Sequence, residues 1–322
     1  MLSPAGSPHA DAHADAARGA GAGAPAAPPA APDGASGGAE EPDVIFRAAG
    51  TFLAESAGAL ARGSEPPRLR VLDAGTGRSS VSWLLRSPFV GSWAAVTASG
   101  VMEREVAGVV AAAEGARAAG APPLPPGRVV RASWDEPDCL RGEAFDAVVA
   151  DYLLGAVDGF TPYRQDVLFE RLLQHLAPNG TLVVVGLEPI PNDAPPPADV
   201  VSKCARLRDA VFLHAGQRPY REYPLQWVTR ALRRAGMRVA LVRRFPILYS
   251  VQDLVKELNT ARSRLPAVRE RSGARFADAL AEHIDAVEAT TRARLAEQPG
   301  GKLGFGEDYL VCAVRDSPPC QP

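Results

Sequence analysis

The chain has few of the features that mark secreted, zinc-binding or membrane-spanning proteins. Its 322 residues include only four cysteines, with no C-x-x-C pair and no histidine at ligand spacing. The sequence therefore predicts neither a disulfide framework nor a zinc site, and a reducing intracellular compartment fits best. It also lacks an uncharged run of about 18 apolar residues, so we expect no membrane span. We expect a cytoplasmic protein, with a plastid or another organelle as the alternative.

The first part of the chain lacks a periodic apolar face. Residues 1–43 consist mainly of Ala, Gly and Pro, and such a segment cannot offset its ordering entropy by burying surface. We predict a disordered tail here, and a second short tail at residues 317–322. An organelle-targeting peptide is the alternative for the first tail. Its only Arg or Lys is Arg18, and it contains Asp11 and Asp15, which does not suit an acid-poor transit sequence.

The remaining composition is that of an ordinary globular protein, with 46% hydrophobic and 22% charged residues. The net charge of −2 conceals an asymmetry, because residues 1–200 hold 14 Lys and Arg against 24 Asp and Glu, whereas residues 201–316 hold 21 against 13. The basic second half could attract an anionic substrate or nucleic acid. The alternative is exposed basic helix faces, which the helical spacing of Arg230, Arg233, Arg234 and Arg238 favours.

Strand-like and helix-like segments alternate along most of the chain. An amphipathic helix over 44–62 is expected to cover the sheet or the mouth of a ligand site. The predicted strands are 69–73, 93–97, 128–132, 145–150, 181–186, 238–244 and 308–314, and the predicted helices are 79–87, 101–118, 163–176, 199–214 and 224–235, followed by a long helical stretch over 251–297. This order predicts an α/β fold with a doubly wound, Rossmann-like sheet, parallel except for the last strand.

We expect one domain over residues 44–316, with helical insertions at about 195–235 and 251–297. The second insertion could be a lid or a dimer face, so a homodimer is left open. Ligands of such a sheet gather at the carboxyl ends of its strands.

The most informative segment is the turn after the first strand, Asp73-Ala-Gly-Thr-Gly. Gly75 and Gly77 allow a tight turn, Ser79 or Ser80 can cap the next helix, and the backbone amides could hold an anion or an amino-acid-like group. A dinucleotide turn would place its third glycine at position 80, which is serine, and the Asp73 carboxylate would repel a pyrophosphate. Structural use of the glycines alone is the alternative.

This turn resembles that of class I S-adenosylmethionine-dependent methyltransferases, and residues 68–187 continue the likeness. His175-Leu-Ala-Pro-Asn-Gly resembles the family's turn before the fifth strand, with Asn179 in the left-handed position that a glycine usually takes. The resemblance implies S-adenosylmethionine as cofactor and methyl transfer as activity. Segment 145–225 is also similar to algal methyltransferases, which suggests an S-methyltransferase of the methylthio-hydroxybutyrate type.

The resemblance also implies a set of cofactor contacts. The acidic residue and the glycine turn would hold the amino-acid end of the cofactor, and the second strand would end at the ribose, where the family usually has Asp or Glu. Here Thr97 and Ser99 could make only single hydrogen bonds, with Glu103 as a substitute. Trp134 and Asp135 would meet the adenine, or else serve as core and turn cap. The predicted cofactor residues are Asp73, Gly75, Thr76, Gly77, Thr97, Ser99, Trp134, Asp135 and Asp151.

Acceptor residues are expected where polar side chains gather near the same strand ends. Asp151, Tyr152 and Glu188 are the catalytic candidates, although a thioether acceptor would need no base. Arg218 and Arg221 could clamp a carboxylate, unless the loop that carries them is simply solvated. The predicted acceptor-binding residues are Tyr163, Gln165, Asp166, His214, Arg218, Tyr220, Arg221 and Tyr223. Clustered metal ligands are lacking, so we expect no metal.

Three classes of function remain open from the sequence. The first is a methyltransferase of a small polar acceptor that carries a carboxylate, such as a thioether acid of dimethylsulfoniopropionate synthesis, or an O- or N-methyltransferase of another metabolite. The second is a protein or RNA methyltransferase, although no clustered Lys with interleaved aromatics supports nucleic acid as a partner. The third is a cofactor-binding module without catalysis.

Overall fold

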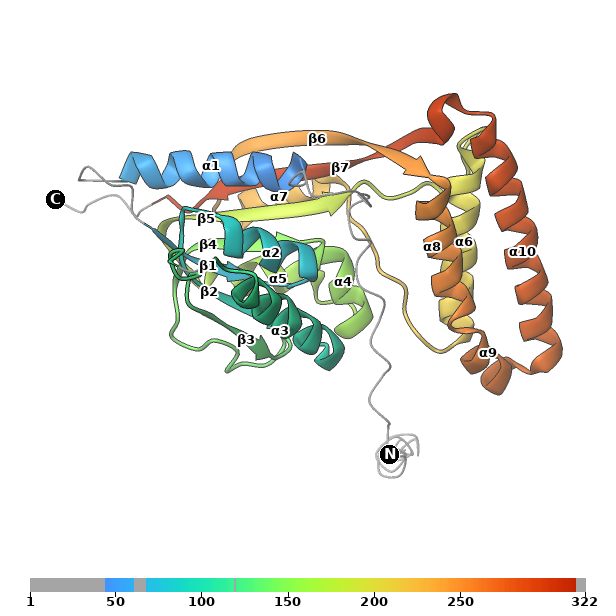
Figure 1. Ribbon diagram of the computed structural model, residues 1–322, viewed down its shortest axis with the longest axis horizontal. Coiled ribbons are helices and arrows are strands. Elements are labelled where there is room, and N and C mark those ends of the chain that lie inside the picture. Colours follow the sequence, from blue (N-terminus) through green and yellow to red (C-terminus); the bar gives the residue numbers. More distant parts are fainter. Residues whose placement is uncertain (1–43, 61–67, 119, 317–322) are drawn as a thin grey trace, which may run out of the picture.

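The computed structural model describes residues 44–60, 68–118 and 120–316, with a seven-stranded sheet at its centre (Figure 1). Both predicted tails lie outside these residues. The strand order is β3-β2-β1-β4-β5-β7-β6. The strands are β1 Leu69–Asp73, β2 Val90–Thr97, β3 Gly127–Arg131, β4 Phe145–Asp151, β5 Leu176–Leu187, β6 Arg238–Ser250 and β7 Lys302–Val314. Only β7 runs against its neighbours, β5 and β6. The predicted doubly wound, mostly parallel sheet is confirmed.

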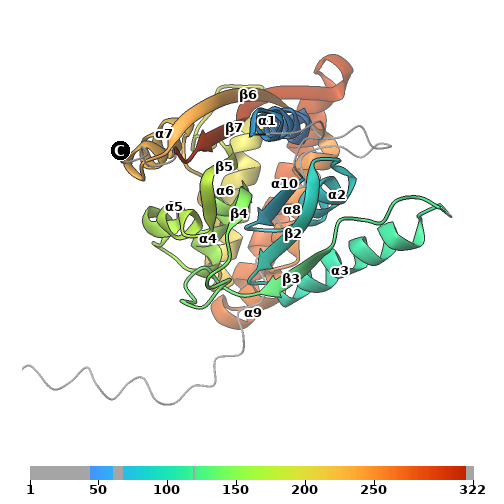
Figure 2. The same ribbon diagram turned by 90° about the vertical axis from the view of Figure 1, so that its left-hand side faces the viewer.

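Helices cover both faces of the sheet, so β1, β2, β4 and β5 can be almost continuously apolar. One face packs on α1 Val44–Leu60, α2 Arg78–Arg86 and α3 Gly100–Gly115. The other packs on α4 Leu153–Phe160, α5 Gln165–Leu173 and α7 Leu225–Arg234. Figure 2 shows α2 and α3 on one side of the sheet and α4 and α5 on the other.

The remaining helices form a separate layer beyond the carboxyl end of β5 (Figure 1). They are α6 Asp199–His214, α8 Val251–Arg262, α9 Leu265–Ser272 and α10 Ala274–Ala296, and they bury a core of their own. Strand β6 leads directly into α8, and α10 returns through a short 3-10 turn into β7. Beyond Leu187, where β5 ends, β6 and β7 pair only with each other among the described strands, as far as Ser250 and Lys302.

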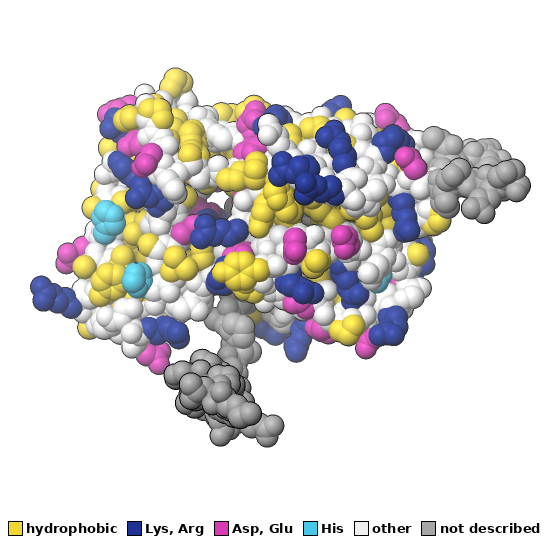
Figure 3. All heavy atoms as spheres, turned by 180° about the vertical axis from the view of Figure 1, so that it is seen from behind, with side chains coloured by type: hydrophobic (Ala, Val, Ile, Leu, Met, Phe, Trp, Pro, Cys, Tyr) yellow, Lys and Arg dark blue, Asp and Glu magenta, His cyan; other side chains and the backbone are white. Residues whose placement is uncertain are grey.

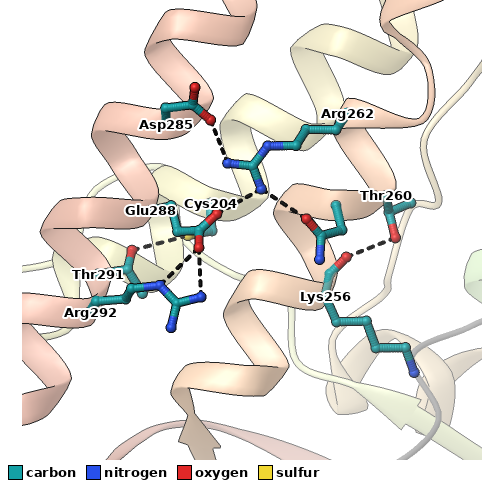
Figure 4. Close-up of polar contacts among 9 residues, drawn as sticks. Cys204, Lys256, Thr260, Arg262, Asp285, Glu288, Thr291 and Arg292 are labelled. Atoms are coloured by element: carbon teal, nitrogen blue, oxygen red, sulfur yellow. Dashed lines mark hydrogen bonds and ion pairs between the residues drawn. The ribbon is translucent and has the colours of Figure 1, made fainter.

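Polar contacts connect three helices of this layer (Figure 4). Arg262 of α8 binds two carboxylates of α10, Asp285 at 2.6 Å and Glu288 at 2.7 Å. The fully buried Thr291 of α10 lies 3.5 Å from the Cys204 thiol of α6. These contacts fix the register between the helices, in addition to the apolar core that drives their packing.

Several predicted boundaries are wrong. The stretch 251–297 is divided into three helices, and Gly273, with a left-handed φ of 93°, separates α9 from α10. The predicted helix 163–176 is only α5, and the preceding α4 was missed. The two predicted insertions also divide differently: α6 joins the helical layer, whereas α7 packs on the sheet. Asn179 does take the left-handed conformation, with φ of 62°.

Candidate functional site

A largely apolar cavity opens at the carboxyl ends of β1, β2 and β4, where the sequence predicted a ligand site. It holds about 1110 Å³ of empty space, including its open mouth, which suits a ligand of cofactor size. Its wall brings together the predicted residues Gly75, Thr76, Gly77, Thr97, Ser99, Trp134, Asp151, Tyr152 and Tyr220. The other predicted site residues do not line this cavity.

The glycine turn after β1 is tied to both neighbouring strands. The Ala74 amide donates to the carbonyl of Val149 at 2.7 Å, and the Thr76 amide donates to that of Val96 at 3.1 Å. The turn therefore offers fewer free amides than the sequence suggested. The two glycines differ in what surrounds them. A Cβ at Gly77, in the cavity wall, would meet no protein atom within 4 Å, whereas a Cβ at Gly75 would lie 2.8 Å from Cδ1 of Leu153, so Gly75 allows the turn to pack against α4.

Asp73 lies behind this turn and supports it. Its carboxylate is fully buried and accepts a hydrogen bond of 2.7 Å from the hydroxyl of Ser80, which itself accepts from the Gly77 amide at 3.0 Å. Ser80 stands where a dinucleotide-binding turn would have its third glycine, and its hydroxyl links the Gly77 amide to the Asp73 carboxylate. Burial raises the pKa of Asp73 to about 6, although the hydrogen bond from Ser80 opposes the rise.

This raised pKa predicts a pH-dependent stability. The pKa of Asp73 is about 6 in the folded chain and 3.8 ordinarily. Its contribution to stability is therefore greatest below the unfolded value and is lost as the pH rises through about 6. We expect wild type to lose about 1.4 kcal/mol relative to Asp73→Asn between about pH 5 and pH 8. Urea unfolding of both chains at the two pH values measures this, and equal pH dependence would contradict it.

The second strand ends with two hydroxyls that already serve the backbone. The Thr97 hydroxyl accepts from the Ser99 amide at 3.1 Å, and the Ser99 hydroxyl caps α3 by accepting from Met102 at 3.3 Å. Both still line the cavity. Glu103, the suggested substitute, lies in the first turn of α3 and does not line the cavity.

Trp134 and Asp135 both follow β3, but only Trp134 lines the cavity. The Trp134 indole is buried in the cavity wall, and its Nε1 donates to the carbonyl of Ala74 at 2.6 Å, which anchors the ring to the glycine turn. Asp135 is exposed and pairs with Arg164 at 2.9 Å, on the rim of a second hollow. Asp135 therefore does not line the cavity that Trp134 lines, because Arg164, directly before α5, binds it at the other hollow.

The fourth strand delivers Asp151 and Tyr152 to the cavity. Tyr152 is the N-cap of α4 with a left-handed φ of 46°, and its amide donates to the carbonyl of Val185 at 3.1 Å. A non-glycine residue in this conformation is uncommon and often occurs at functional sites. The helix that begins there adds Leu153, Val157 and Phe160 to the wall.

The expected carboxylate clamp is not formed. The guanidinium of Arg218 binds the buried carboxylate of Asp158 on α4 at 3.0 Å and stacks on the exposed Tyr163 ring. Gln165 donates to the same Asp158 at 3.1 Å. The side chain of Arg221 is exposed. The loop cation is thus neutralised within the chain, which the sequence could not reveal because α4 was not predicted.

The other predicted acceptor residues lie apart from the cavity. His214 packs edge-on against Phe276 of α10, with ring centroids 4.6 Å apart. Tyr223 packs on Trp227, with centroids 4.4 Å apart. Asp166 is exposed in the first turn of α5. Glu188 pairs with Arg244 at 3.1 Å.

Sequence reasoning missed the apolar part of the wall. Ile45 and Phe46 come from the start of α1, and Met102 comes from α3. The predicted helix 44–62 was expected to reach a ligand site, so its first apolar residues were the available signal. The described residues contain no group of three or more His, Cys, Asp or Glu that could hold a metal ion, and none of their helices is long and apolar enough to cross a membrane.

Comparisons with known proteins identify the fold. No family model matches the chain, and no curated protein matches it. A candidate methyltransferase from Bacillus halodurans C-125 superposes with a TM-score of 0.50 at 15% identity, over 83% of this chain and 100% of that one. The YcgJ protein from Bacillus subtilis gives 0.48 at 16% identity, over 82% and 99%. At 15% identity, the likeness to the Bacillus halodurans protein shows the fold alone.

Proposed function

We propose that this chain, which has the Rossmann-like fold of class I methyltransferases, is an S-adenosylmethionine-dependent methyltransferase acting on a small polar acceptor. The observation that carries the proposal is the apolar cavity built on the Asp73-Ala-Gly-Thr-Gly turn at the strand ends. When bound, S-adenosylmethionine supplies a methyl group activated by a sulfonium. The chain's own part is to bind, orient and exclude water, from which much of the acceleration of methyl transfer can come.

The cavity residues fit such a cofactor. Gly77 admits close approach of its amino-acid end, and the buried Asp73 places negative potential behind that turn. The Thr97 and Ser99 hydroxyls would meet the ribose, and the flat Trp134 indole would meet the adenine. Asp151 and Tyr152 would then face the methyl group from the end of β4.

The charged residues of the chain bear on which class of acceptor is favoured. The thioether acid suggested by the sequence depended on Arg218 and Arg221 as available cations, and Arg218 is bound to Asp158. A macromolecular acceptor would favour a continuous basic surface. Arg230, Arg233 and Arg234 are exposed on the outer face of α7, and the face in Figure 3 intersperses basic with acidic side chains. A small metabolite is therefore the proposed acceptor.

Isothermal titration with S-adenosylmethionine and S-adenosylhomocysteine tests the cofactor proposal directly. We expect Ser80→Ala to weaken binding about tenfold, because the Gly77 amide and the Asp73 carboxylate would lose their common partner and the turn would loosen. Ser82→Ala, on the same helix but outside the cavity wall, is the matched control and should bind like wild type.

Labelled cofactor offered with a panel of small amines, phenols, thiols, thioethers and carboxylic acids then tests transfer. If wild type binds neither cofactor form at millimolar concentration, the chain is not a methyltransferase of this kind. Binding without transfer to any acceptor class would favour a module that has lost catalysis.

A further inference from the structure

Glu222 is an acidic side chain that the cofactor proposal leaves unused. It is half-buried at the carboxyl end of β5, where the Leu187 amide donates a hydrogen bond to its carboxylate. On its other side it presses against Gly155 of α4 so closely that a Cβ at position 155 would overlap the carboxylate oxygens. The Arg221 amide donates to the Gly155 carbonyl at 3.2 Å, which fixes this segment on α4.

Tyr220 connects Glu222 to the cavity. It comes from the same segment and forms part of the cavity wall. The negative charge of Glu222 contributes to raising the pKa of the Tyr220 hydroxyl, after burial, so the two side chains lie within electrostatic reach. Gly155, which the Glu222 carboxylate contacts, is followed on α4 by Ala156 and Val157 of the cavity wall. The carboxylate therefore lies directly behind the part of the wall against which an acceptor beside Tyr220 would rest.

The surroundings of Glu222 carry more acids than bases. Asp308 of β7 is paired with Leu187 in the sheet register, and its charge adds to the burial that raises the pKa of Glu222 to about 8. Arg208 of α6 opposes this rise, but it already binds both Asp209 and Glu257. After burial, the charge of Glu222 also contributes to raising the pKa of the Tyr309 hydroxyl. That hydroxyl donates a hydrogen bond to the Tyr223 carbonyl at 2.7 Å.

We propose that Glu222 binds a protonated amine acceptor beside Tyr220 and takes the proton that blocks its nitrogen. This inference rests on the proposed methyltransferase function. The proton moves from the ammonium nitrogen to the Glu222 carboxylate, which frees the nitrogen lone pair. A bond then forms from nitrogen to the methyl carbon while the carbon–sulfur bond breaks and its electron pair stays on sulfur. The methylated amine keeps the positive charge, so charge and atoms balance.

The acidic surroundings of Glu222 favour an amine over a thioether or a carboxylate as the acceptor. A carboxylate acceptor would face Glu222 and Asp308, and both would repel it. A thioether has no proton to lose, so it would gain nothing from a proton acceptor. The positive charge of a bound amine would lower the pKa of Glu222 by direct attraction. Amine binding therefore favours the ionised carboxylate, which is the form that can accept a proton.

The test compares two probes of equal length on the full chain loaded with S-adenosylhomocysteine, with which no methyl transfer can occur. The probes are N-methylethanolamine, a cation, and 2-(methylthio)ethanol, its uncharged thioether counterpart. By calorimetry at about pH 8.5 we expect the amine to bind about tenfold tighter, since a hydrogen bond to a charged group is worth about 1.5–3 kcal/mol. The preference should shrink at about pH 6.5, where Glu222 is protonated.

Glu222→Gln should abolish both the preference and its pH dependence while leaving the affinity for S-adenosylhomocysteine within about twofold. Glu270→Gln, an exposed position on α9, is the matched control and should behave as wild type. If loaded wild type binds the amine no better than the thioether, the inference is wrong. That comparison needs no variant, so a Glu222→Gln chain that fails to fold does not remove it. Failure of wild type to bind S-adenosylhomocysteine would instead contradict the proposed function.

Discussion

Trp134→Ala is expected to lower the free energy of unfolding by about 3–5 kcal/mol and to weaken cofactor binding at the same time. The indole is 9% exposed and fills the space between the cavity and the ring of His175, with centroids 5.8 Å apart. Its removal leaves a void and leaves the Ala74 carbonyl without its donor. Guanidinium unfolding followed by circular dichroism measures the first effect, and titration with S-adenosylhomocysteine measures the second.

Trp134→Phe separates the two roles of the indole. It keeps an aromatic surface but cannot donate to Ala74, so we expect a loss of about 1–3 kcal/mol from the unmade hydrogen bond. If Trp134→Ala and Trp134→Phe were equally destabilised, the bond to the turn would matter more than the filled volume. A loss below about 1 kcal/mol for the alanine variant would contradict the packing described here.

Gly186→Ala is expected to destabilise the sheet by about 3 kcal/mol or more, because overpacking a close-packed core forces neighbours apart. An added Cβ would lie 2.5 Å from Cζ of Tyr309 and closer still to its hydroxyl. The Tyr309 ring is 1% exposed and its hydroxyl is bonded to the Tyr223 carbonyl, so it cannot swing aside. Denaturant midpoints of the two chains measure the effect.

Gly108→Ala provides the contrast within the same chain. Gly108 lies inside α3, and a Cβ there would meet no atom within 4 Å. This change should stabilise the chain by about 0.5–1 kcal/mol, because alanine favours helix over glycine. Equal midpoints for Gly186→Ala and wild type would show that the β5–β7 contact relaxes without cost.

The parts of the site that could be predicted from the sequence lie in consecutive residues. Strand β1, the glycine turn and the first residues of α2 form one local unit, so their pattern indicates both structure and ligand position. The order of the strands places Thr97, Trp134 and Asp151 at the same sheet edge, because parallel strands share their carboxyl ends. Local patterns therefore predicted much of the polar part of the cavity wall, whereas most of its apolar residues were not predicted.

The parts that could not be predicted depend on contacts between distant segments. Arg218 and Asp158 are 60 residues apart, and no spacing rule joins them. The approach of Glu222 to Gly155 likewise appears only when the loop folds onto α4. That helix was missed because its apolar residues follow those of β4 without a capping side chain to separate the two elements.

The length of β6 and β7 affects how the helical layer is connected to the sheet. Past the end of β5 they form a ladder of two strands with Gly304 and Gly306 in it. Two-stranded ladders twist more readily than wide sheets. Because β6 leads into α8 and α10 leads back into β7, a change in the twist of this ladder would change the tilt of α8 and α10 relative to the sheet.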